Sequence, residues 1–233
     1  MVNQALNLHC VILARGGSKS IPGKNTIDFL GKPLIAWTIE QCRSSEYVSD
    51  IWVSSNDPLI LSIASKYGAK TIERPDSISG DLATSESGWL HAITHLIDRG
   101  EKINAVLAPQ VTSPLRETSD INNAAEKFLK GNYDSMFSAS LADDLFFWEE
   151  SLEGVNSINY DYKNRKRRQD FKKQIIENGS LYIFKPEILK EYKNRMGGKI
   201  GFSTMDFWKM FEIDNDDDIR MCSALMKEFL IKD

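Results

Sequence analysis

The chain has 233 residues, of which 42% are hydrophobic and 27% charged, and this balance is typical of globular proteins. Its length fits one large domain, or one domain with a smaller extension. A formal net charge of −4 argues against a protein whose whole surface binds nucleic acid, but it permits a local cationic site.

The cysteines and the N-terminal residues indicate the cellular compartment in which the protein is expected. Cys10, Cys42 and Cys222 are odd in number and stand among apolar residues, which predicts buried free thiols in a reducing compartment and no disulfide framework. Residues 1–9 lack the cationic and apolar regions of a signal peptide, and no apolar run reaches membrane-spanning length. We therefore expect a cytoplasmic protein with no membrane or nucleic-acid partner.

The first half of the chain alternates strand and helix patterns. Residues 8–14 form an apolar run typical of a strand buried on both faces, Pro33 stands at a helix start, and residues 51–54 predict a second strand. Asp57 and Pro58 then supply the cap and first-turn proline of a helix that Gly68 ends.

The alternation continues to residue 139. We expect strands near residues 69–72, 103–108 and 135–139, and helices over residues 85–98 and around residues 121–129. This order predicts an α/β fold of three layers, Rossmann-like, with a mainly parallel sheet between helices. Ligands of such sheets bind beyond the carboxyl ends of the strands, so the loops that follow the strands should converge on one crevice.

The pattern weakens from residue 141. Residues 143–148 are acidic and aromatic and predict a surface hairpin or dimer arm, and residues 163–173 are basic. A strand is expected over residues 179–184, and another over residues 210–214 leads into a capped C-terminal helix. We interpret residues 1–233 as a single domain in which residues 141–178 form a possible dimerisation or sugar-binding insertion.

The loop after the first strand carries three glycines and three cations. Glycines allow backbone N–H groups to approach an anion closely, and cationic side chains supply the opposing charge. These residues are Gly16, Gly17 and Gly23, with Arg15, Lys19 and Lys24. The pattern indicates a phosphate cradle, and the alternative is a glycine-rich surface turn with incidental lysines.

Two common phosphate motifs do not fit this loop. A Walker A loop would need glycine at Ser18 and a hydroxyl residue at Asn25. A Rossmann fingerprint fails because Gly16 and Gly17 are adjacent and no helix signal follows at once.

Residues 14–19 and 21–25 instead resemble the signature of sugar-nucleotide-forming nucleotidyltransferases, and more narrowly that of the acylneuraminate (CMP-sialic acid) cytidylyltransferase family. The resemblance extends through nearly the whole chain. It implies that the first loop binds the nucleotide, through Ala14, Arg15, Gly16, Gly17, Ser18, Lys19, Lys24 and Asn25.

Arg74 and residues 83–85 resemble the family's base-recognition segment, which implies that Arg74, Ala83 and Ser85 contact the cytosine. Fixed donors and small residues suit close approach to a pyrimidine edge. The alternative is an ordinary helix N-terminus, capped by Thr84 or Ser85.

Residues 110–116 resemble the family's Gln-Pro-Thr-Ser-Pro-Leu-Arg loop, which implies that Gln110 contacts the sugar. Val111 stands where that motif has proline, which puts the stiffness of the loop in question. A buried structural glutamine is the alternative.

Residues 167–170 and 177–182 resemble two further family elements. They imply contacts to the sugar substrate or leaving group from Arg167, Arg168, Gln169, Asn178 and Tyr182. Bacterial relatives often carry arginine near position 176, where this chain has isoleucine. The alternative for the basic run is a solvated face, the usual reading of Lys163, Lys172 and Lys173.

Glu212 and Asp214 are two residues apart, so on a strand they would face the same side. The family holds Mg²⁺ with an Asp-x-Asp pair here, and glutamate remains a hard oxygen ligand. By contrast, Asp216, Asp217 and Asp218 are expected to cap and charge the helix that follows.

The resemblance implies a Mg²⁺-dependent homodimer that transfers CMP from CTP to a nine-carbon 2-keto-3-deoxy sugar acid, a nonulosonic acid, with Arg15, Lys24, Arg167 and Arg168 as catalytic residues. One alternative is a cytidylyltransferase for an eight-carbon octulosonate. Another is a non-catalytic nucleotide-sensing module.

Overall fold

The protein's structure, a computed structural model, describes residues 7–142, 145–152 and 154–231. The central sheet consists of β1 (Leu8–Leu13), β4 (Val48–Ser55), β5 (Lys70–Glu73), β6 (Ala105–Pro109), β7 (Ser135–Leu141), β10 (Ile175–Phe184) and β11 (Ile200–Thr204). Their order across the sheet is β11-β7-β10-β6-β1-β4-β5. Among the described strands of this central sheet, only the pairings of β10 with β6 and β7 are antiparallel, so the predicted mainly parallel sheet is confirmed.

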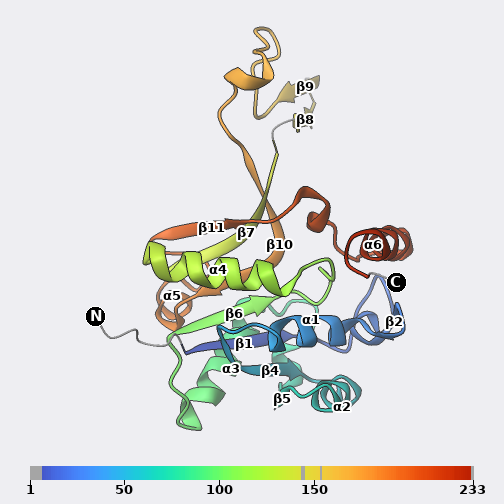
Figure 1. Cartoon of the computed structure of the whole chain (residues 1–233), viewed down its shortest axis with the longest axis vertical. Helices are drawn as coiled ribbons and strands as arrows, with labels where there is room; N and C mark the ends of the chain where they lie inside the picture. The colour runs from blue at the N-terminus through green and yellow to red at the C-terminus, as the bar shows by residue number, and fades with distance from the viewer. Residues whose placement is uncertain (1–6, 143–144, 153, 232–233) are drawn as a thin grey trace.

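Helices cover both faces of the sheet (Figure 1). They are α1 (Leu34–Arg43), α2 (Pro58–Lys66), α3 (Ser85–Asp98), α4 (Thr118–Gly131), α5 (Pro186–Tyr192) and α6 (Asp216–Phe229). Cys10 and Ile12 of β1 pack into one core with α1, α2, α4 and α6, whereas Val11 packs into a second core with α3 and α5. Successive residues of β1 thus serve opposite cores, which confirms the three-layer prediction.

Local signals set the helix ends where they were predicted. The Asp57 side chain accepts a hydrogen bond from the Leu59 amide at 2.8 Å, and Pro58 occupies the first helical position of α2. Thr84 caps α3 through the Ser87 amide. Asn215 caps α6 in a capping box with Asp218.

An arm, residues 145–152 and 154–174, projects from the sheet beyond the end of β7 and the start of β10 (Figure 1). It contains the hairpin β8 (Trp148–Ser151) and β9 (Gly154–Ser157), and the 3₁₀ turn η3 (Arg168–Asp170). The surface hairpin was predicted over residues 143–148, but the observed hairpin is formed by Trp148–Ser151 and Gly154–Ser157, so the two share only Trp148. Residues 143–144 of the prediction lie outside the described residues.

The strand predicted over residues 210–214 is wrong. The 3₁₀ turn η4 (Phe207–Met210) is followed by irregular backbone, in which the Ile213 amide donates to the Thr112 carbonyl at 2.8 Å. That contact is isolated, so no ladder forms. The remaining short elements are η1 (Lys24–Thr26), β2 (Asp28–Phe29), β3 (Lys32–Pro33) and η2 (Asp76–Ile78).

Cys10, Cys42 and Cys222 are buried free thiols, as predicted. Within the described part of the chain, no helix combines the length and apolar character needed to cross a membrane.

Candidate active site

A pocket of about 310 Å³ lies where β1 and β5 end. It brings together four of the residues predicted to bind nucleotide, Arg15, Arg74, Ala83 and Ser85. These residues come from two segments, the loop after β1 and the stretch from the end of β5 to the start of α3, so the expected convergence of post-strand loops is present on this side of the sheet.

Arg74 is held rigidly in the wall of this pocket. Its side chain is only 6% exposed, and its Nε donates to Ser79 Oγ at 3.0 Å. A Cβ on Gly88 of α3 would lie 2.9 Å from Arg74 Nη1, so a larger residue there would push the guanidinium from its present place. Burial, and secondarily the charge of Arg15, lowers the pKa of Arg74. Two cations close together favour binding of an anion.

Asp81 holds the two cations of the first loop. Its carboxylate lies 3.0 Å from Arg15 Nη1 and 2.8 Å from Lys19 Nζ, and the hydrogen bond from Lys19 is the main reason that the pKa of Asp81 is lowered. About half of the Asp81 side chain is exposed, so a phosphate can replace it against these cations. Asp81 was not predicted as a site residue, although its position between Arg74 and Ala83, in the predicted base-recognition segment, could have identified it.

The backbone of the first loop is shaped by contacts from neighbouring turns. The Gly16 amide donates to Asn56 Oδ1 at 3.2 Å, and a Cβ on Gly16 would lie 2.7 Å from Asp57 Oδ2. Asn25 Nδ2 donates to the Arg15 carbonyl at 3.0 Å. Asn25 therefore braces the loop from within, while Gly17 and Lys19 are exposed at its tip.

Lys24 reaches from this loop to the other end of the site. Its Nζ donates to Asp214 Oδ1 at 2.8 Å and to the Ile213 carbonyl at 3.1 Å. Ile213 is fully buried and anchors the segment, so the flanking Glu212 and Asp214 are kept close to Lys24. The structure thus unites the predicted phosphate cradle with both predicted metal ligands.

Glu212 is the unusual carboxylate of the pair. Burial, together with the nearby charge of Asp214, raises the pKa of Glu212, although a hydrogen bond from Thr112 Oγ1 at 3.2 Å opposes the shift. A cation shared by Glu212 and Asp214 would relieve this repulsion. Hard carboxylate oxygens suit a divalent ion such as Mg²⁺, so these residues fit the implied metal.

Gln110 lies beside the carboxylates. Gly179 has φ of +67°, and a Cβ there would lie 3.3 Å from Glu212 Oε1 and 3.6 Å from Gln110 Nε2. The Thr112 hydroxyl lies 3.5 Å from Gln110 Oε1, which places Thr112 between the predicted sugar contact and Glu212. Thr112 was missed as a site residue, although it lies in the predicted loop.

The other predicted sugar contacts have different surroundings. Tyr182 donates its hydroxyl to Glu177 at 2.6 Å, and the Arg195 guanidinium stacks on its ring at 4.6 Å. Asn178 is buried, and its side chain bonds to Ser138 and Ser140. Its amide is therefore occupied by the protein's own polar network.

Arg167 and Gln169 are not brought to the pocket. Both are exposed on the arm, where Arg167 pairs with Asp170 at 3.1 Å, and Arg168 lies between them in η3. The arm extends away from the sheet and its surrounding helices (Figure 1).

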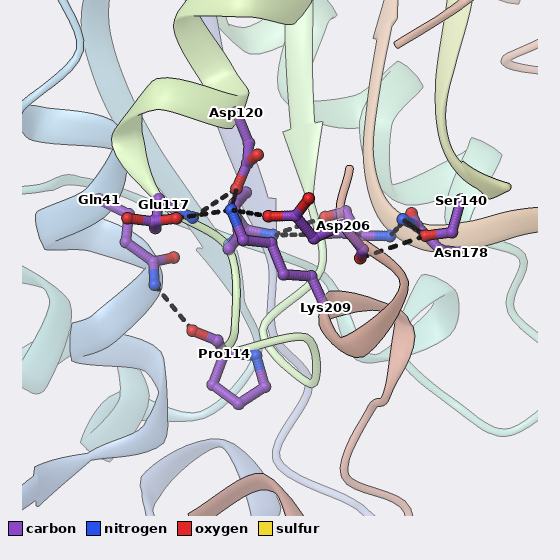
Figure 2. A network of polar contacts seen from close by, with 10 residues as sticks. Gln41, Pro114, Glu117, Asp120, Ser140, Asn178, Asp206 and Lys209 are labelled. Atoms are coloured by element: carbon purple, nitrogen blue, oxygen red, sulfur yellow. Dashed lines mark hydrogen bonds and ion pairs between the residues drawn. The ribbon is translucent and has the colours of Figure 1, made fainter. Parts of the chain in front are cut away.

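A buried lysine fixes the segment that leads to Glu212. Figure 2 shows Lys209 at the centre of a polar network, with its Nζ 2.6 Å from Glu117 and 2.8 Å from Asp120. Burial lowers the pKa of Lys209, but the two carboxylates raise it by more, so the pKa of the lysine is raised overall. The network joins η4 to the start of α4 and so holds the backbone just before the metal carboxylates.

Comparison with known proteins gives a family match across most of the chain. The family model described as Cytidylyltransferase matches residues 9–228. A CMP-N,N'-diacetyllegionaminic acid synthase of Legionella pneumophila is 38% identical, with 89% of this chain and 95% of that protein covered. A pseudaminic acid cytidylyltransferase of Campylobacter jejuni is 36% identical over 75% of this chain and 76% of its own length.

Other matches differ in length or are similar in fold alone. An N-acylneuraminate cytidylyltransferase A of Danio rerio is 33% identical over 91% of this chain, which spans about half (49%) of that protein. The solved structure of CMP:2-keto-3-deoxy-manno-octonic acid synthetase complexed with CTP has a TM-score of 0.73 at 15% identity, covering 96% of this chain and 100% of that one. This match supports the nucleotidyltransferase fold.

Proposed function

We propose that this chain, which belongs to the cytidylyltransferase family, transfers CMP from CTP to a nonulosonic acid and releases pyrophosphate. Relatives that are 33–38% identical and carry the names of N-acylneuraminate, pseudaminic acid and legionaminic acid enzymes support this substrate class. The observation that carries the proposal is the pair of cations Arg15 and Arg74 in one pocket, next to a loop whose Lys24 bonds to the carboxylate of Asp214.

Each part of the crevice then has a role. Ala83, Ser85 and Arg74 would face the cytosine side of CTP, while Arg15, Lys19 and Lys24 would meet the triphosphate. Gln110 would contact the sugar acid, because it lies beside Glu212 where nucleotide and sugar must meet.

The reaction joins two anions. The anomeric hydroxyl of the sugar acid attacks the α-phosphorus of CTP in line, its proton is lost, and the bond to pyrophosphate breaks. Two like charges about 4 Å apart near a protein surface repel by roughly 4 kcal/mol. Such transfers depend on positioning and charge neutralisation and need no protein nucleophile. Arg15, Lys19 and Lys24 would supply that neutralisation.

Cytidylyltransferases generally use a divalent metal, and we propose Mg²⁺ here, held by Glu212 and Asp214. When bound, the ion neutralises phosphate charge and orients the α-phosphate. Lys24 now bonds to Asp214, and it becomes free to contact phosphate oxygens once Asp214 has another cationic partner.

We further propose a homodimer. Arg167, Arg168 and Gln169 lie on an arm that leaves their own chain's crevice, so they can serve a site only if the arm meets a second copy. Exposed apolar side chains on the arm, including Trp148, Leu152 and Val155, provide a surface for such contact. On this view residues 1–233 act as one domain with an intersubunit arm, in the cytoplasm, where CTP is made.

A pyrophosphate-release assay tests the function. CTP, UTP, ATP and GTP are each supplied with N-acetylneuraminic, pseudaminic, legionaminic and keto-deoxyoctulosonic acids, with Mg²⁺. We expect release with CTP and one of the nine-carbon acids. Release with the octulosonate alone would reassign the substrate, and nucleotide binding without any release would favour a nucleotide-sensing module.

A further inference from the structure

A second group of metal-binding side chains lies at the opposite end of the sheet. His9 of β1 and Asp50 of β4 are register partners at the amino ends of their strands, and Glu101 comes from the loop between α3 and β6. One ligand atom from each residue lies within 4.8 Å of those of the other two. The catalytic crevice begins at residue 14, about 16 Å further along β1 at the usual rise per residue.

His9 is poised to act as a ligand. It is 3% exposed, and its Nε2 lies 3.2 Å from the Lys102 carbonyl. A carbonyl oxygen can only accept, so Nε2 is the donor, and in the neutral imidazole Nδ1 is then the nitrogen with the lone pair. Nδ1 is buried and has no hydrogen-bond partner among the described residues, an arrangement that costs free energy. A hydrogen bond from the second ring nitrogen to a carbonyl is also what orients metal-bound histidines.

The carboxylates supply the matching charge. Asp50 and Glu101 each have about 30% of their side chains exposed, and the cation between them is Lys70, at 2.8 Å from Asp50 and 3.9 Å from Glu101. Lys70 is 48% exposed on a flexible stem, so it can withdraw into solvent. Each carboxylate also has a second oxygen to offer a metal.

We propose that His9, Asp50 and Glu101 form a binding site for a divalent transition-metal ion, with Zn²⁺ as the best match. One imidazole and two carboxylates are common zinc ligands, and water would complete a tetrahedral shell. The ion would tie β1, β4 and the α3–β6 loop together at the end of the sheet remote from CTP, a structural role independent of the proposed reaction.

The experiment titrates Zn²⁺ alone into chelator-treated protein, with Mg²⁺ in excess to occupy Glu212 and Asp214. Isothermal titration calorimetry and elemental analysis give the stoichiometry, and thermal unfolding gives the effect on Tm. The chain's other histidines, His91 and His95, are four residues apart on α3 and could chelate Zn²⁺ themselves. The double variant His91→Gln/His95→Gln is therefore the starting protein, or parent, for all further substitutions.

The parent should bind one equivalent of Zn²⁺ and gain Tm, and adding His9→Gln should remove both effects without changing transferase activity. If His9→Gln does not fold, Glu101→Gln in the exposed loop replaces it, with at least tenfold weaker binding expected. The proposal is overturned if the variant that folds still binds one equivalent of Zn²⁺. It is also overturned if the parent binds no Zn²⁺.

The variant Lys70→Met should change the Zn²⁺ affinity in the opposite direction. Removing the competing ammonium should tighten Zn²⁺ binding by about tenfold or more. Unchanged or weaker binding would show that Zn²⁺ does not enter between Asp50 and Glu101, and would overturn the proposal.

Discussion

Arg74 and Arg167 are both assigned to anionic substrates, yet their settings differ. Arg74 is 6% exposed, packed against Gly88 and bonded to Ser79, whereas the Arg167 side chain is 77% exposed on the arm and pairs with Asp170. A buried, bonded arginine loses little side-chain entropy when it binds a ligand, and an exposed one loses more. On the proposed function, the body of the protein would therefore bind nucleotide by itself, while the arm would need a second surface to act.

We expect the largest loss of activity from a substitution of Asp214 in the body of the protein. Asp214→Asn removes the negative charge that would bind the metal and that pairs with Lys24, while its amide oxygen can still accept from Lys24. We expect activity to fall at least a thousandfold, about 4 kcal/mol in barrier. EDTA should abolish wild-type activity, and Mg²⁺ should restore it. Turnover is measured by pyrophosphate release.

Asp217→Asn is the matched control for this change. Asp217 is 89% exposed in the first turn of α6, three residues further along, and it should tolerate the same substitution. Full Mg²⁺-dependent activity in Asp214→Asn would mean that the metal lies elsewhere.

The next largest effect should come from Lys24. Lys24→Ala removes a charge-stabilising donor that is 13% exposed, and losses of about 100- to 1000-fold in kcat are usual for such donors. Lys19→Ala, at a side chain that is 75% exposed, should cost only a few-fold. Circular dichroism confirms folding, and equal losses in the two variants would contradict a directed role for Lys24.

Much of the body was predictable because its signals are local. Asp57 and Pro58 start α2, and the helix predicted over residues 85–98 is observed with those bounds. A buried parallel strand such as β1 is a continuous apolar run that few other elements imitate.

The errors have a physical cause in long-range contacts. Residues 211–214 alternate apolar and acidic side chains as a strand does. The Ile213 amide, however, bonds to a single carbonyl in a distant loop, so the alternation occurs without a strand ladder. Neither the partnership of Asp81 with Arg15 and Lys19 nor that of Lys24 with Asp214 can be read from spacing, because the partners are 62 to 190 residues apart. Both follow only from the folded topology.

Substitutions of Arg167 test whether the arm contributes to catalysis. Arg167→Ala should lower catalytic efficiency by about 10- to 100-fold and leave stability nearly unchanged, because exposed ion pairs such as that with Asp170 contribute little to folding. Arg167→Lys should recover part of the loss, since lysine lacks the planar fork. Lys172→Ala and Lys173→Ala should behave like wild type.

Mixing variants shows which chain the arm serves. If Arg167 acts across a dimer, the impaired Lys24→Ala and Arg167→Ala proteins, unfolded and refolded together, should show more activity in mixed dimers than either variant shows alone. Absence of recovery, or equal behaviour of all the arm variants, would show that the basic run is a solvated face.

The smallest effect concerns stability at the metal carboxylates. The pKa of Glu212 is raised by burial and by Asp214, so the folded protein holds this proton more readily than the unfolded chain. Ionised Glu212 is therefore a cost that exists above that pKa and is relieved as pH falls. Without metal, Glu212→Gln should raise Tm at pH 8, and the gain should shrink as the pH is lowered towards 5.

The expected gain is modest, since about 1 kcal/mol shifts Tm by roughly 2–4 °C in a chain of this size. Glutamine keeps an oxygen that can accept from Thr112, so the change isolates charge from hydrogen bonding. Saturating Mg²⁺ should reverse the order, because the ion stabilises the wild-type carboxylate pair and binds the variant weakly. A wild-type protein that is more stable than Glu212→Gln at pH 8 without metal would indicate that the cationic Lys24 already neutralises the pair, and that Glu212 has no repulsion left for a metal to relieve.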